Sequence, residues 1–341
     1  MPTKVYGLGL VLAILSIDPA AAQGLETLGN RAAALSAFVA VADDVSAVAW
    51  NPAGLVIGPF FNASLDLGRS KSVPDDAPEA FATASRLGTS MIAVGVPPLG
   101  LSYYRVASRV LEGVGSQVGD DPNQDGRHVV ARSLVTTHLG ATFLQSLGDH
   151  LTVGTTLKLV RGSVATALFP VATWSAGFDR LDLVETEGST RADLDVGAMF
   201  AMARVRAGIV ARNLTKPEFD VSDDEESMDI ALDRHARIGV AWGDRWPGLA
   251  RTIAAVDVDL TRVPHSTGER RDIAAGIERW LLRRQQLGIR GGVRASTVGD
   301  ARPVVSGGLS YAIRSGTYVD AYLARGDREH TAWGVGARLT Y

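Results

Sequence analysis

Apolar and polar residues alternate with a period of two along several segments, and this periodicity constrains the fold more than any other feature. In residues 251–262, Val256 and Val258 fall on one face, whereas Asp257 and Asp259 fall on the other. Successive side chains of a β-strand point to opposite faces, so the pattern predicts strands. The apolar faces carry Ala, Val, Leu and Thr, and the opposite faces carry Asp, Arg, Lys and Gly. This division favours a transmembrane barrel with a lipid-facing exterior and a polar lumen, although dyad alternation also leaves a water-soluble β-sandwich open.

The connections between the expected strands alternate between long and short. Strands are predicted near residues 58–70, 87–97, 99–109, 129–146, 150–162, 191–203, 204–214, 234–243, 250–262, 271–282, 285–296, 303–314, 316–326 and 330–341. The short connections lie at 97–98, 148–149, 203–204, 283–285 and 315–316, and the long ones at 71–86, 110–128, 163–190, 215–233 and 263–270. Outer-membrane barrels have tight periplasmic turns and longer external loops. The expected fold is therefore all-β, an antiparallel transmembrane barrel of about 14 strands with both termini in the periplasm.

Composition excludes several functional classes. The chain contains no cysteine, so disulfides, thiolate metal sites and a catalytic Cys are excluded. A net charge of −3, with charges interspersed along the sequence, gives no basis for nucleic-acid binding. The six histidines lack paired metal-binding spacing and no GxSxG motif occurs, so we expect no enzyme activity.

The N-terminus has the layout of a signal peptide. Lys4 precedes an apolar stretch over residues 5–17, and small residues end at Ala22. The stretch is shorter than the roughly 20 residues of a spanning helix. We expect a cleaved signal peptide at 1–22, an N-terminal plug segment at 23–57 and an outer-membrane barrel at 58–341.

Two short helical turns and a kink are predicted for the segment before the first strand. Asp43 or Asp44 can cap a helix over VSAVAW, and Pro52 ends it by forcing Asn51 out of the helical region. Gly54 offers a position without the Cβ restriction. A barrel of about 14 strands has a lumen that its own side chains cannot fill, so this segment is expected to occupy it.

The stretch GNRAAALSAFVAVADDVSAVAWNPAGL resembles the N-terminal plug of the FadL/TodX outer-membrane transporter superfamily, and equally that of its PorV-like and TraF-like relatives. The resemblance implies a 14-stranded barrel through which hydrophobic or small solutes pass, gated by the plug. For PorV-like relatives it implies instead a non-transporting barrel that anchors or shuttles exported partner proteins. The implied partners are outer-membrane lipid, a hydrophobic small molecule or exported protein, and the barrel assembly machinery. The expected plug and gate residues are Asp43, Asp44, Ser46, Trp50, Asn51, Pro52, Ala53 and Gly54.

Three further groups of residues are candidates for binding. The apolar external loop 163–190 predicts a ligand-binding patch of Phe169, Trp174, Phe178 and Leu181. The stretch DDPNQDGR resembles the start of a calcium loop, with Asp121, Asn123 and Asp125 as ligands but Arg132 at the twelfth place, and no other cofactor is expected. Charges assigned to the lumen, to brace a plug or tune solute passage, are Arg132, Lys158, Arg161, Asp193, Asp195, Arg212, Asp257, Asp259, Arg290, Arg294 and Arg338. An acidic run at 220–229 is expected to be a solvated loop.

Overall fold

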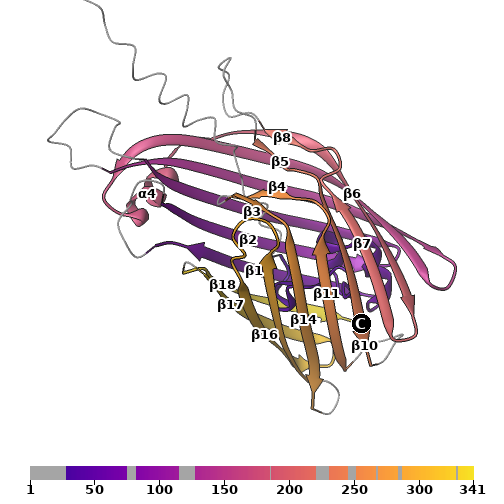
Figure 1. Ribbon diagram of the computed structural model, residues 1–341. Coiled ribbons are helices and arrows are strands. Elements are labelled where there is room, and N and C mark those ends of the chain that lie inside the picture. The colour runs from indigo at the N-terminus through magenta and orange to yellow at the C-terminus, as the bar shows by residue number, and fades with distance from the viewer. Residues whose placement is uncertain are drawn as a thin grey trace, which may run out of the picture.

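The computed structural model shows a closed antiparallel β-barrel with an N-terminal segment inside it (Figure 1). It describes residues 28–74, 82–114, 127–184, 186–219, 230–244, 251–265, 268–282, 286–327 and 329–341. The expected signal peptide at 1–22, the calcium-loop residues Asp121, Asn123 and Asp125, and the acidic run at 220–229 lie outside these ranges.

Fourteen strands form the barrel, which confirms the fold class and the number of strands expected from the alternation. Their order around the wall is β1-β18-β17-β16-β15-β14-β11-β10-β7-β6-β5-β4-β3-β2, closed by the pairing of β1 with β2. The bounds are β1 Asn62–Ser72, β2 Thr83–Val96, β3 Leu99–Val114, β4 Arg127–Leu147, β5 Leu151–Val171, β6 Glu187–Met202, β7 Val205–Arg212, β10 His235–Gly243, β11 Thr252–Asp259, β14 Asp272–Leu281, β15 Leu287–Ser296, β16 Val304–Arg314, β17 Thr317–Gly326 and β18 Thr331–Thr340.

Consecutive strands pair as hairpins, so the connections alternate between the two ends of the barrel. The tight turns at 97–98, 148–150, 203–204 and 315–316 share one end, here called the short-connection end. Gly148 and Gly316 occupy two of these turns with φ of 71° and 81°, a region that favours glycine. Asn62 of β1 pairs with Thr340 of β18, so the C-terminus also lies at this end.

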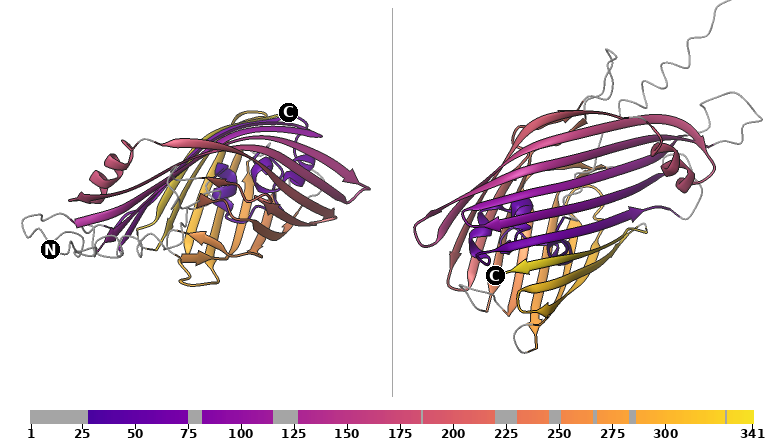
Figure 2. Two further views of the ribbon diagram at one scale, coloured as in Figure 1. Left: turned by 90° about the horizontal axis from the view of Figure 1, so that it is seen from above. Right: turned by 180° about the vertical axis from the view of Figure 1, so that it is seen from behind.

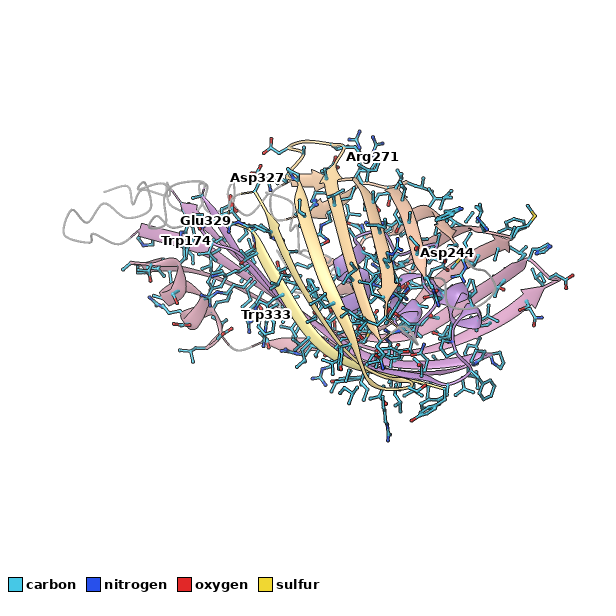
Figure 3. All side chains as sticks on the ribbon, turned by 90° about the horizontal axis from the view of Figure 1, so that it is seen from below. Trp174, Asp244, Arg271, Asp327, Glu329 and Trp333 are labelled. Carbon is cyan, nitrogen blue, oxygen red and sulfur yellow. The ribbon has the colours of Figure 1, made fainter. Side chains whose placement is uncertain are left out.

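The two faces of the wall differ as the alternation predicts. Val256 is 46% exposed on the outside of β11, whereas its neighbour Asp257 is 1% exposed on the inside. Leu157 and Lys158 of β5 show the same contrast. Trp333 of β18 also lies on the outer face (Figure 3). Within the described ranges, no helix combines the length and the apolar character that a membrane span requires.

One side of the wall is taller than expected. β5 was predicted to end at residue 162, but it continues to Val171 and is followed by helix α4, Trp174–Leu181. The strand continues because α4 covers its outer face there, a tertiary contact that strand alternation does not reveal. Two small hairpins were not predicted either: β8 Glu218–Phe219 with β9 Ile230–Ala231, and β12 Val263–His265 with β13 Gly268–Arg270.

The N-terminal segment, residues 28–57, lies inside the barrel (Figure 2). It contains α2 Asn30–Leu35, α3 Ala47–Trp50 and the 3-10 helix η2 Pro52–Ile57. Every residue from 28 to 55 is buried. α2 packs against β14–β18, and η2 packs against β4–β6 on the opposite wall. The segment thus crosses the lumen, and the first strand begins at Asn62 rather than at the predicted residue 58.

Candidate functional site

The bend between α3 and η2 follows from the Asn51-Pro52 step. Asn51 adopts an extended conformation, with φ −151° and ψ 100°, as expected for a residue before proline. Its side-chain oxygen accepts a hydrogen bond from the Ala53 amide, and its Nδ2 donates to the Val39 carbonyl at 3.0 Å. Nδ2 also lies 3.3 Å from the carbonyl oxygen of Ala198 in β6. Asn51 therefore caps η2 and fixes the bend to the wall.

Two local roles differ from the sequence-based expectations. The residue before α3 is Ser46, and Asp44 accepts hydrogen bonds from the Ser46 amide and hydroxyl instead of capping the helix itself. Gly54 is required by close packing and not by its backbone conformation, because a Cβ there would lie 1.9 Å from the Ala42 carbonyl oxygen. Both residues hold the segment in its folded shape.

Arg31 of α2 is the centre of a buried ion-pair network. Its guanidinium lies 2.5 Å from Asp43 Oδ1, 3.2 Å from Asp44 Oδ2 and 2.8 Å from both carboxylate oxygens of Glu278 in β14. Asp43 also pairs with Arg206 of β7 at 3.1 Å. Arg31 therefore links α2 and the Asp43-Asp44 step to β14, and Asp43 links the same segment to β7.

The network continues along the wall behind α2. Glu278 pairs with Arg290 of β15 at 3.1 Å, and Arg290 and Arg338 both approach Asp320 of β17. A buried charge that loses its partner destabilises the folded state, so removing any one of these groups should weaken the whole network. Sequence reasoning assigned Arg290 and Arg338 to the lumen but missed Arg31, Arg206, Glu278 and Asp320; Glu278 and Asp320 occupy inward positions that the alternation alone could have identified.

The charges within the segment are held ionised by this environment. Burial works against ionisation of Asp44, but the charges of Arg31 and Arg338 and the Ser46 hydrogen bond outweigh it and hold the pKa of Asp44 below its ordinary value. Burial also opposes the charge of Arg31, yet Asp43 and Glu278 raise the Arg31 pKa well above its ordinary value. Arg31 and Asp44 therefore both carry their charges in the physiological pH range.

Backbone groups of the segment are satisfied by the wall as well. Asp257 of β11 accepts hydrogen bonds from the amides of Phe38 and Val39, at 2.6 and 2.9 Å. Asp66 of β1 accepts from the amide and side chain of Asn30. Phe38 and Val39 lie beyond the end of α2, and Asn30 is its first residue, so none of these amides has a partner within the helix. The carboxylates therefore supply the hydrogen bonds that these buried amides need.

Inward-facing glycines of the wall let the segment approach closely. A Cβ at Gly154 of β5 would lie 2.4 Å from the Ala53 nitrogen, and one at Gly276 of β14 would lie 2.1 Å from the Leu35 carbonyl oxygen. Gly292 and Gly208 have similar clashes with Leu35 and Val39. In these places the backbone of the segment occupies the space that wall side chains would otherwise fill.

The structure brings together the four residues predicted as an external binding patch. Phe169 of β5 and Trp174, Phe178 and Leu181 of α4 are all buried in one cluster with Leu111 and Val129 (Trp174 in Figure 3). Leu111, Val129 and Phe169 lie on the same outward face as Leu159, because all occupy alternate positions of paired strands. Their apolar surface is thus covered by α4, and ligand binding by these residues stays a prediction.

The expected lumen charges are inside the barrel with one exception. Lys158 pairs with Asp193 and Asp195, each at 2.8 Å, and Asp259 pairs with Arg237 and His235. Arg161 was assigned to the lumen, but it is exposed on the outer face because it shares the parity of Leu157 and Leu159. The described part of the chain contains no cluster of three metal-ligating side chains, and the predicted calcium ligands are outside it.

Several solved barrels share this fold. The Ralstonia pickettii toluene transporter TbuX aligns over 94% of this chain and 100% of its own, with a TM-score of 0.61 and 12% identity. The CymD monoaromatic hydrocarbon channel aligns over 94% and 99%, with a TM-score of 0.60 and 14% identity. A Pseudomonas aeruginosa FadL homologue aligns over 92% and 98%, with a TM-score of 0.55 and 14% identity.

At these identities the likeness concerns the fold, and it matches the FadL/TodX-type barrel expected from the sequence. A comparison with functionally curated proteins gives no match. A sequence family does match: residues 23–259, more than two thirds of the chain, fit the family described as "F plasmid transfer operon, TraF, protein". The match includes the whole N-terminal segment and the wall as far as β11, and on this basis the chain belongs to that TraF family.

Proposed function

We propose that this protein is an outer-membrane barrel through which small hydrophobic solutes pass by diffusion, and that the N-terminal segment is a plug that gates the route. The observation that carries the proposal is the unbroken burial of residues 28–55 across the lumen of a closed barrel. Solved barrels of the same fold are named as a toluene transporter and a monoaromatic hydrocarbon channel, which supports this class of solute.

Placement in a membrane is supported by the outer face of the wall. The outward residues of β5 from Leu151 to Leu159 carry no charge and include Val153 and Leu157. Nine residues is close to the length of about 9–11 that a tilted strand needs to cross the hydrocarbon layer. The inward residues of the same stretch include Lys158, which is compatible with a polar lumen.

Gating by the plug is supported by the way in which it is held. Its contacts with the wall are ion pairs, hydrogen bonds and packing, with Arg31 and Asp43 as the main ionic attachments. These contacts are non-covalent, so the plug can rearrange without breaking a covalent bond. The rearrangement requires only that its charged groups form new ion pairs or become hydrated. The charged wall favours compact solutes over long acyl chains.

The absence of cysteine makes a direct test of gating practical. The hydroxyl oxygens of Ser36 and Ser306 lie 3.0 Å apart, so S36C/S306C brings two sulfurs into range of a disulfide between plug and wall. The hydroxyls of Thr142 and Thr156 lie 2.8 Å apart on β4 and β5, so T142C/T156C is a matched disulfide within the wall.

Uptake of radiolabelled toluene is measured in cells that express each variant and retain an intact outer membrane, before and after reduction. We expect the oxidised S36C/S306C protein to reduce uptake to the level of cells without the barrel, with recovery on reduction. The Thr156 hydroxyl also lies 3.4 Å from the Val48 carbonyl of the plug, so the control is read within the variant: T142C/T156C is expected to give the same uptake oxidised and reduced. Equal uptake by locked and unlocked plug refutes gating, and uptake that never exceeds the background refutes transport of this solute.

A further inference from the structure

Six cationic side chains are grouped on the outer face of β1–β5, next to the apolar stretch of each strand. They are Arg69, Lys71, Arg86, Arg105, Arg109 and Arg161, here called the outer basic patch. Arg105 and Arg161 are both paired with Thr137 of β4, on opposite sides, and are therefore two strand spacings, about 10 Å, apart. Lys71, Arg86 and Arg109 form a second row through direct pairing.

The outer face of β1–β5 carries no acidic side chain beside the outer basic patch, as far as these strands are described. The described outward positions of β1–β5 include no Asp or Glu. Arg69, Arg105 and Arg161 have no carboxylate within ion-pair distance among the described residues, and Arg105 and Arg161 are exposed. The acidic contact at the border of the patch comes from α4, where Asp182 lies 2.6 Å from Arg109.

Local packing holds these side chains in place along the surface. A Cβ at Gly88 would lie 2.4 Å from Arg69 Nη1, and one at Gly188 would lie 3.2 Å from Arg161 Nε, so glycines leave room for both guanidiniums. The Arg86 guanidinium lies 4.2 Å from the centre of the Phe178 ring of α4. The outer surface therefore changes along the strands from apolar residues to the basic patch and then to the α4 cluster.

We propose that the outer basic patch binds the phosphate groups of membrane lipid headgroups. This inference rests on the membrane placement proposed above. A headgroup phosphate bound there would be continuous with acyl chains lying against Tyr103, Leu139 and Leu159, which are exposed on the same face. Guanidinium groups match phosphate by paired N–H donors, and cations at the membrane surface attract anionic lipid. α4 bounds the site on the side away from the apolar stretch and positions Arg86 and Arg109.

The test measures lipid binding by the detergent-purified full chain with native mass spectrometry. The probe is diphosphorylated lipid A, compared with the same acylated disaccharide without phosphates. The variant R69Q/R105Q/R161Q removes three cations of the patch, and R279Q removes an exposed outward arginine of β14, away from the patch. Losing surface cations is expected to weaken binding roughly fivefold for each, or on the order of a hundredfold for three.

The proposal expects preference for the phosphorylated probe, loss of that preference in the triple variant, and unchanged binding by R279Q. Inorganic phosphate at millimolar concentration should not displace the lipid. The proposal is overturned if both probes bind equally, or if the triple variant binds the phosphorylated probe as well as the unmodified chain does. Full displacement of the lipid by inorganic phosphate also overturns it. Heat-modifiable migration on gels verifies that each variant retains its barrel. Because no solute flux is measured, a failed uptake experiment and a failed lipid experiment remain distinguishable.

Discussion

Replacing Arg31 with Gln should release the N-terminal segment without opening the barrel. Arg31 is 6% exposed and contacts Asp43, Asp44 and Glu278, so the substitution leaves buried carboxylates short of a cation. Breaking a buried ion pair in this way typically costs about 3–5 kcal/mol. The strand pairing of the wall does not involve Arg31, so the cost should fall on local opening of the segment.

Amide hydrogen exchange measures this opening directly. The amides of Phe38 and Val39, which donate to Asp257, should exchange about 150-fold to about 5000-fold faster in R31Q than in the unmodified chain. Amides of β4 and β5 should be unchanged, and R279Q is the matched control.

The double variant R31Q/E278Q should exchange more slowly than R31Q, since it removes one of the stranded carboxylates. Unchanged exchange at Phe38 and Val39, or an equal increase throughout the wall, would refute the assignment of Arg31 as the main attachment of the segment.

The remaining predictions concern pH, packing and the two helical attachments. The pKa of Asp44 is held below its ordinary value of 3.8, so the stabilisation from its charge is complete above that pH and is lost as the pH falls through the lower, folded-state value. Amide exchange of the segment, corrected for intrinsic rates, should therefore rise only below about pH 4. In Arg31→Gln this rise should begin at a higher pH, because Arg31 is one of the charges that lower the pKa of Asp44. Gly154→Ala should prevent seating of the segment and expose residues 36–45 to protease, because the new Cβ meets backbone atoms. Asn51→Ala should lower the free energy of segment opening by about 1–2 kcal/mol, measured by exchange. Phe178→Ala should lower the stability of α4 by about 3 kcal/mol, seen as faster exchange of its amides.

Matched substitutions separate these effects from general destabilisation. Gly291→Ala places a Cβ 3.7 Å from its nearest neighbour, so it should leave segment and barrel intact and serves as the control for Gly154→Ala. If Gly154→Ala gives no more cleavage of residues 36–45 than this control, close packing of the segment on β5 is refuted. If Phe178→Ala changes exchange in the segment as much as in α4, the α4 cluster is not a local unit.

The alternation of residues predicted the barrel well because the outward and inward faces of each strand carry different kinds of residue. The contrast between Val256 and Asp257 is local information, and all fourteen barrel strands were anticipated from it. β5 was predicted to end at residue 162, but its last part continues under α4. α4 packs there against Leu111 of β3 and Val129 of β4 as well, and strand alternation does not reveal such a tertiary contact.

Parity was also more reliable than residue type. Arg161 was assigned to the lumen because it is charged, although its position in β5 follows Leu157 and Leu159 on the outside. The Arg31 site could not be assembled from the sequence, since its partner Glu278 is 247 positions away and only the closed barrel brings the two together. The Asn51-Pro52 bend, in contrast, depends on adjacent residues and was predicted correctly.

The long sequence separations within the Arg31 network also have a consequence for assembly. Asn30 can meet Asp66 early, but Asp43 must wait for Arg206, 163 positions later, and Arg31 for Glu278. Until then the N-terminal segment lacks part of its ionic contacts, and bringing its distant partners together carries a large loop-closure entropy. The N-terminal segment and the final strands should therefore reach their native positions in one concerted late step. The barrel then closes around the segment, and the segment does not insert into a barrel that has already closed.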